Sequence, residues 1–132
     1  MTWHVLEVSL ELIRCLRDIV AILARYDADL AGQIRRAASS VPANLSEGQR
    51  RAGRDRCYHY RVAAGSAEEV RAALRTAAAW GYVDGDAVAR PLALLDRLGA
   101  MLYRMTDGSS PGGAGDPLRQ GQFTVASCAS VR

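Results

Sequence analysis

Apolar side chains recur at spacings of three and four residues through residues 3–26, and this period restricts the fold more than any other feature of the chain. Such spacing predicts an α-helix, because it places side chains on one face of a helical turn of about 3.6 residues. Two neighbouring apolar rows follow it. The first row is Val5, Val8, Leu12, Cys15, Ile19, Ile22 and Tyr26, and the second is Leu6, Ile13, Leu16, Val20 and Leu23.

The two rows give this helix more apolar surface than one core contact requires. The apolar arc covers roughly 200°, whereas a helix that packs on one side needs ~100°. Either the helix is buried between two neighbours of a bundle, or its second row forms an interface between subunits.

A second helix is predicted from an N-cap at Asp27 or Asp29 to a natural stop at Gly48. Its apolar face consists of Leu30, Ile34, Ala37, Val41 and Leu45. Pro42 lies inside this helix and predicts a kink near residues 39–42, because proline removes a backbone donor and clashes with the preceding turn.

A third helix is predicted from a cap at Asp55 to about Trp80, with a core row of Tyr60, Ala63, Ala67, Val70, Leu74 and Ala77. Gly65 inside it costs about 1 kcal/mol relative to alanine, which predicts close approach by a neighbouring helix. A turn at residues 81–86 precedes a fourth helix that runs to about Met105. Its apolar side carries Val88, Leu92, Leu95, Leu98, Leu102 and Met105.

No segment alternates convincingly with a period of two, and no hairpin signal joins two apolar runs, so strands are not predicted. Four helices with short connections predict an all-α fold, an antiparallel up-and-down four-helix bundle over residues 1–106. Residues 107–132 hold five Gly, two Pro and four Ser and are predicted to form a flexible tail.

Composition excludes several classes of protein. Hydrophobic residues make up 49% and charged residues 23%, which is the balance of a folded domain. Glu7, Glu11 and Arg14 interrupt the most apolar stretch, so neither a transmembrane helix nor a signal peptide is predicted, and we expect a cytoplasmic protein. Three irregularly spaced cysteines and two histidines form neither a disulfide framework nor a zinc site, so no metal or cofactor is expected.

The charge is unevenly distributed along the chain. All 17 basic residues are arginine and the net charge is +3, yet residues 33–61 hold seven arginines against two acids, giving +5. The seven are Arg35, Arg36, Arg50, Arg51, Arg54, Arg56 and Arg61. Guanidinium groups grip phosphates and the interleaved tyrosines can stack on bases, so these arginines are the candidate nucleic-acid site. The alternative is a solvated basic end of a bundle, with Arg35 and Arg36 paired to acids elsewhere.

No set of residues points to catalysis. Nothing resembles a nucleophile elbow or an ordered triad, and the usual P-loop is impossible without lysine. The pair Glu68 and Glu69 is interpreted as a solvated face with arginines one or two turns away. We therefore expect a protein that is not an enzyme.

Residues 30–48 resemble the signature of a bacterial family, the intervening-sequence proteins of large-subunit ribosomal RNA genes. The Gln-Ile-Arg-Arg-Ala element at residues 33–37 and the Asn-x-x-Glu-Gly element at residues 44–48 carry the likeness. Residues 60–70 are similar to the family's third-helix motif, and residues 81–83 to its turn before helix 4. The resemblance covers residues 5–106.

This resemblance implies an up-and-down four-helix bundle that assembles as a homopentamer. It also implies kinship with the accessory variability (Avd-like) proteins of diversity-generating retroelements, which form basic pentameric barrels that bind nucleic acid and a reverse transcriptase. Within the signature, Asn44 and Glu47 are interpreted as structural, bonding to backbone or to Arg35 and Arg36 and fixing the kinked helix.

The sequence favours two alternative functions. The first is a homo-oligomeric bundle that binds RNA or DNA through the arginine-rich corner between the second and third helices. The second is a protein-interaction scaffold, such as an accessory subunit that docks a retroelement reverse transcriptase.

Overall fold

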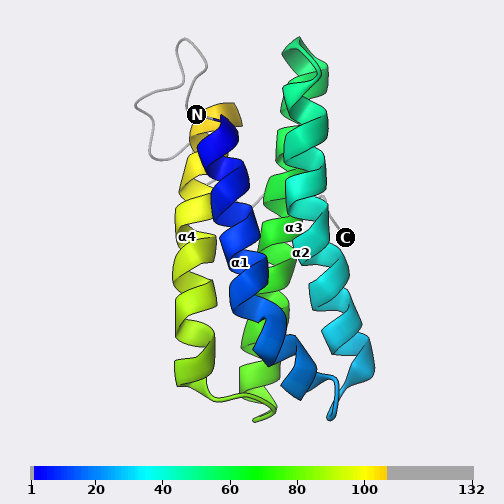
Figure 1. Cartoon of the computed structure of the whole chain (residues 1–132), viewed down its shortest axis with the longest axis vertical. Helices are drawn as coiled ribbons and strands as arrows, with labels where there is room; N and C mark the ends of the chain where they lie inside the picture. The colour runs from blue at the N-terminus through cyan, green and yellow to red at the C-terminus, as the bar shows by residue number, and fades with distance from the viewer. Residues whose placement is uncertain (1, 107–132) are drawn as a thin grey trace, which may run out of the picture.

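The computed structural model describes residues 2–106, which form four α-helices: α1 (Thr2–Leu23), α2 (Ala28–Gln49), α3 (Gly53–Ala79) and α4 (Gly85–Thr106). Each helix packs against the next, and α1 also packs against α4, so the four close an antiparallel bundle (Figure 1). The predicted all-α four-helix bundle is confirmed. The predicted tail, residues 107–132, lies outside the described residues.

The core of α1 takes members from both of the predicted apolar rows. The buried residues follow spacings of three and four and are Val5, Val8, Leu12, Leu16, Ile19 and Leu23. Cys15 is half-buried, and Ile22 and Tyr26 are exposed, so these three members of the first row lie outside the buried core of α1. The buried stripe runs along the boundary between two rows that lie side by side on the helix. Leu6, Ile13 and Val20, seven residues apart, remain half-buried beside it.

The start of α2 agrees with the sequence, and the start of α3 does not. Asp27 is the N-cap of α2, since its carboxylate accepts a hydrogen bond of 2.9 Å from the Leu30 backbone N–H. The third helix begins at Gly53, whose φ of +60° is a conformation that glycine adopts without strain. Asp55 therefore lies inside the first turn and does not cap it.

The α2 helix runs without a break past both residues that were expected to disturb it, Pro42 and Gly48. The helix continues through Pro42 to Gln49, and in Figure 1 its ribbon changes direction near its middle, as the proline predicts. Gly48 is not the stop that we predicted, because it is a buried residue within the helix with an ordinary negative φ.

The predicted core row of α3 is confirmed. The predicted close approach of a neighbouring helix at Gly65 is wrong for the described chain. All six predicted residues of that row are buried. A Cβ added at Gly65 would meet no atom within 4 Å, so no neighbouring helix approaches this glycine.

The α2–α3 end of the bundle extends beyond the neighbouring ends of α1 and α4 (Figure 1). Residues 49–56 are exposed without interruption, as expected for a hairpin that leaves the core behind. No described helix is long and apolar enough to cross a membrane.

Candidate nucleic-acid interface

The projecting end of the α2–α3 hairpin carries five of the seven predicted arginines. We call residues 47–61 the α2–α3 tip. The tip holds Arg50, Arg51, Arg54, Arg56 and Arg61 against Glu47 and Asp55, giving a net charge of +3. The five arginines differ in whether their side chains already have a partner, and this difference decides which of them could bind a phosphate without breaking a contact.

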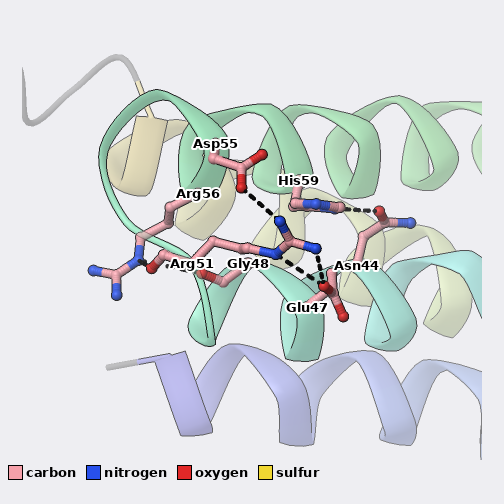
Figure 2. Close-up of polar contacts among 7 residues, drawn as sticks. All are labelled: Asn44, Glu47, Gly48, Arg51, Asp55, Arg56 and His59. Atoms are coloured by element: carbon pink, nitrogen blue, oxygen red, sulfur yellow. Dashed lines mark hydrogen bonds and ion pairs between the residues drawn. The ribbon is translucent and has the colours of Figure 1, made fainter.

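Arg51 lies between two carboxylates (Figure 2). Its Nη2 is 2.7 Å from Oε1 of Glu47, and its Nη1 is 2.9 Å from Oδ2 of Asp55. The hydrogen bond and charge of Arg51 lower the pKa of Glu47, and the hydrogen bonds that Arg51 donates to both carboxylates, together with their negative charges, raise the pKa of Arg51. The charge of Arg51 is thus compensated where it stands, and the pair joins the end of α2 to the start of α3.

Arg56 caps the C-terminal end of α2 from the first turns of α3. Its Nε donates to the backbone oxygens of Arg51 at 2.8 Å and Gly48 at 3.2 Å (Figure 2). A cation at these carbonyls also meets the negative end of the helix dipole. The main role of Arg56 is therefore structural, because it joins α3 to the C-terminal end of α2.

Arg50 and Arg54 are the tip arginines that remain available to a ligand. Both are exposed, and neither side chain makes a hydrogen bond or ion pair with any residue of the described range 2–106. Arg61 is also exposed and lies further along α3. Of the tip arginines, Arg50 and Arg54 are therefore the ones that could bind a phosphate without giving up a hydrogen bond or ion pair.

The structure separates Arg35 and Arg36 from the tip. Arg35 and Arg50 are fifteen residue steps apart on α2 and its C-cap, a distance of about 22 Å along the axis. Arg35 instead lines a groove of about 380 Å³ between α1 and α2. The two arginines are exposed, and neither is paired with an acid within residues 2–106, so the alternative that they pair with acids elsewhere is wrong for that range. The seven predicted arginines therefore lie in two separate places, and their binding of nucleic acid stays a prediction.

A row of polar side chains joins α2 to α3 below the tip. The Asn44 side-chain amide donates to the backbone oxygen of Ser40 at 2.9 Å, and its Oδ1 faces His59 Nδ1 at 3.1 Å. Because the amide nitrogen is turned toward Ser40, the Asn44 oxygen accepts and His59 Nδ1 carries the proton. The hydroxyl of Ser66 continues the row with a 2.9 Å hydrogen bond to the Ser40 hydroxyl.

The structure agrees with the interpretation of Asn44 and Glu47 as structural residues, but the arginine that pairs with Glu47 is not one of the two that we expected. Asn44 bonds to backbone within α2 as expected, but Glu47 pairs with Arg51 rather than with Arg35 or Arg36. His59 and Ser66 are polar partners that sequence reasoning missed, because their contacts depend on the register of two antiparallel helices. No local spacing could have revealed them.

Gly48 lets α2 and α3 approach closely at the base of the tip. A Cβ at this position would lie 2.6 Å from Cε1 of Tyr60 and 3.2 Å from Cβ of His59. The Asn-x-x-Glu-Gly element is therefore one structural unit, which supplies an interhelix hydrogen bond, a salt bridge and a close approach.

These features define an all-α bundle whose second and third helices form a basic, projecting hairpin. Within residues 2–106, no cluster of histidine, cysteine, aspartate or glutamate has the arrangement needed to hold a metal ion. The sequence model of the 23S rRNA-intervening sequence protein family matches residues 5–104, and the chain belongs to this family. No curated protein and no solved structure gave a significant match.

Proposed function

We propose that this protein is a non-enzymatic, homo-oligomeric bundle that binds RNA or DNA through the α2–α3 tip. The observation that carries the proposal is the pair Arg50 and Arg54, two exposed guanidiniums with no side-chain partner among the described residues. A phosphate can approach them without breaking an existing ion pair, whereas binding to Arg51 must compete with Glu47 and Asp55.

Removal of these two guanidiniums is the direct test. Anisotropy of a short fluorescein-labelled single-stranded RNA, and of a duplex DNA, is measured against wild type and the Arg50→Gln/Arg54→Gln double variant. Affinity is expected to fall about tenfold or more, since hydrogen bonds to charged groups are among the strongest. The slope of log affinity against log salt should fall by about 0.7 for each single-strand phosphate that the variant no longer binds.

The matched control is Arg25→Gln/Arg75→Gln, which removes the same charge from two exposed arginines near the other end of the bundle. This control should bind as wild type. Equal losses in both double variants would show that only net charge matters, and unchanged binding by the tip variant would reject the site.

The proposal that the protein assembles rests on surplus apolar surface between α1 and α2. The half-buried side chains of Ile13 and Val20 line the groove there, with Arg17 and Arg35 also in its wall. A second copy that covers this strip would explain the excess apolar arc of α1. The family resemblance suggests five copies, about 71 kDa for five chains of 14.2 kDa. A 14.2 kDa species in light scattering at micromolar concentration would reject assembly.

The groove also supports the second candidate function, because an apolar strip is better suited to bind a protein than a nucleic acid. In that case the chain is a scaffold that docks a protein such as a reverse transcriptase. A partner recovered from lysate after nuclease digestion and a high-salt wash supports the scaffold. A partner that disappears under both conditions was held through nucleic acid and supports the first function.

A further inference from the structure

Three aromatic rings stack at the end of the bundle opposite the α2–α3 tip. Tyr26 lies in the α1–α2 connection, and Trp80 and Tyr82 lie in the α3–α4 connection. The ring centroids of Tyr26 and Tyr82 are 5.5 Å apart with an interplanar angle of 11°, and those of Trp80 and Tyr82 are 6.3 Å apart at 18°. We call these three residues the aromatic cluster.

Backbone geometry fixes the central ring of the cluster. The Gly81 N–H donates to the Ala78 oxygen and the Tyr82 N–H to the Ala77 oxygen, both at 3.0 Å. With Gly81 at φ +80°, these bonds form the Schellman motif that ends α3. Tyr82 is half-buried and packs against the core, so the platform on which the other two rings stack is held in place.

The outer rings are open to solvent. Tyr26 is 63% exposed and Trp80 is 69% exposed, and Ile22, one helical turn before Tyr26, is 46% exposed. The protein thus presents large, rigid aromatic surface that the described chain leaves uncovered. A ligand that stacks there meets rings already held in parallel planes, so little side-chain entropy is lost on binding.

The charge of the residues around the aromatic cluster determines whether it attracts a cation or an anion. Residues 24–30 and 80–86, which carry the three rings, contain Arg25 against Asp27, Asp29, Asp84 and Asp86, giving a net charge of −3. The exposed Arg75, five residues before Trp80, reduces the charge of this end to −2. Phosphates are repelled by this end of the molecule, whereas cations are attracted to it. Among cations, the planar guanidinium stacks on aromatic faces, while the compact ammonium of lysine is more strongly hydrated.

We propose that the aromatic cluster, with the four aspartates around it, binds an arginine-rich segment of a partner protein. Guanidinium groups of the segment stack on Tyr26 and Trp80, and neighbouring cationic side chains pair with the carboxylates. This site is independent of the nucleic-acid binding proposed for the tip, because it lies at the other end of α3 and carries the opposite charge.

The test uses the full chain and two synthetic peptides, one alternating arginine with glycine and the other lysine with glycine. In a Trp3→Phe background, Trp80 is the one remaining tryptophan and reports binding by its fluorescence. The Arg50→Gln/Arg54→Gln background removes the two tip arginines that are proposed to bind nucleic acid. The arginine peptide is expected to quench Trp80 and to bind about fivefold more tightly than the lysine peptide.

Peptide anisotropy then separates the rings from general electrostatics. The Tyr26→Ala/Trp80→Ala variant should lose about tenfold in affinity for the arginine peptide, since two stacking surfaces disappear. The control Trp3→Ala removes a ring of similar exposure, 66%, from the other end and should change nothing. Equal binding of both peptides, or unchanged binding by the double variant, overturns the proposal. Quenching of Trp80 by oligouridine instead of the peptide also overturns it, by assigning the cluster to nucleic acid.

Discussion

Gly48 shows how one residue sets the geometry of the tip. Its missing Cβ lets Tyr60 and His59 of α3 lie against α2, at distances that a methyl group would violate. Tyr60 is 4% exposed and belongs to the core, so it cannot swing away from an added methyl group at low cost.

Gly48→Ala is therefore expected to destabilise the fold by about 1–3 kcal/mol through overpacking. Gly65→Ala is the matched control, because a Cβ there meets nothing within 4 Å. That change should stabilise the fold by about 0.5–1 kcal/mol, since alanine is the better helix former. Urea denaturation of both variants measures the difference, and a neutral Gly48→Ala would contradict the close approach.

The salt bridge between Glu47 and Arg51 makes stability depend on pH. The pKa of Glu47 is lowered in the folded state from its ordinary value of 4.5, chiefly by its hydrogen bond to Arg51. A lowered folded pKa means that the stabilisation is present above pH 4.5 and is lost as pH falls through the folded pKa.

Glu47→Gln should accordingly reduce the free energy of unfolding near neutral pH and approach wild type as the solution is acidified below 4.5. Urea is the suitable denaturant, because an ionic denaturant would screen the pair. A difference between the variants that stays constant down to acidic pH would contradict the role of this ion pair.

At the scale of elements, the α2–α3 hairpin is held by contacts that neither helix makes alone. Arg56 of α3 donates to the Gly48 carbonyl at the end of α2, and Arg51 after α2 bonds to Asp55 in the first turn of α3. Below them, the Asn44–His59 bond ties the two helices together. These contacts fix how the exposed arginines of the tip project.

Arg56→Ala is expected to cost about 1 kcal/mol of stability, because the last carbonyls of α2 lose a charged donor. Because the contacts of Arg51 and Asn44 still join α2 to α3, it should lower RNA affinity less than loss of Arg54 does. Arg54→Ala should show the reverse, with stability within about 0.5 kcal/mol of wild type and weaker RNA binding. Paired urea denaturation and RNA anisotropy check this opposition, and parallel losses in both assays for both variants would remove the distinction between cap and ligand-binding arginine.

The sequence predicted elements better than it predicted contacts between elements. Helical period identified all four helices, and the Asp27 cap could be predicted because its bond spans only three residues. The partner of Glu47 could not be predicted, because arginines precede and follow it in the sequence and the pattern alone does not select among them. The aromatic cluster was missed because Tyr26 and Tyr82 meet only when two connections come together at one end of the bundle.

At the scale of the whole molecule, the proposed assembly and the proposed binding function reinforce each other. A ring presents one α2–α3 tip from every copy, so a nucleic acid that spans several tips gains avidity without any new kind of interaction. Binding strength and its salt dependence should then depend on the number of tips joined together.

Ile13→Arg tests this dependence, because it places a charge on the groove face of α1 while the buried stripe stays intact. We expect a folded monomer in light scattering, with RNA affinity lowered about 100-fold and a smaller salt slope. Glu7→Arg, on the exposed face of the same helix, is the control and should preserve the oligomer. A monomeric variant that binds RNA as tightly as wild type would show that one tip suffices.

The opposite charges at the two ends of α3 make each subunit an electric dipole. The positive pole at the hairpin and the negative pole at the other turns are separated by about 40 Å, the length of this helix. A polyanion at close range exerts a torque on such a dipole and turns the hairpin forward before any contact forms. For the nucleic-acid ligand that we propose, the molecule would therefore approach already aligned, and the same field would disfavour collisions in the opposite orientation.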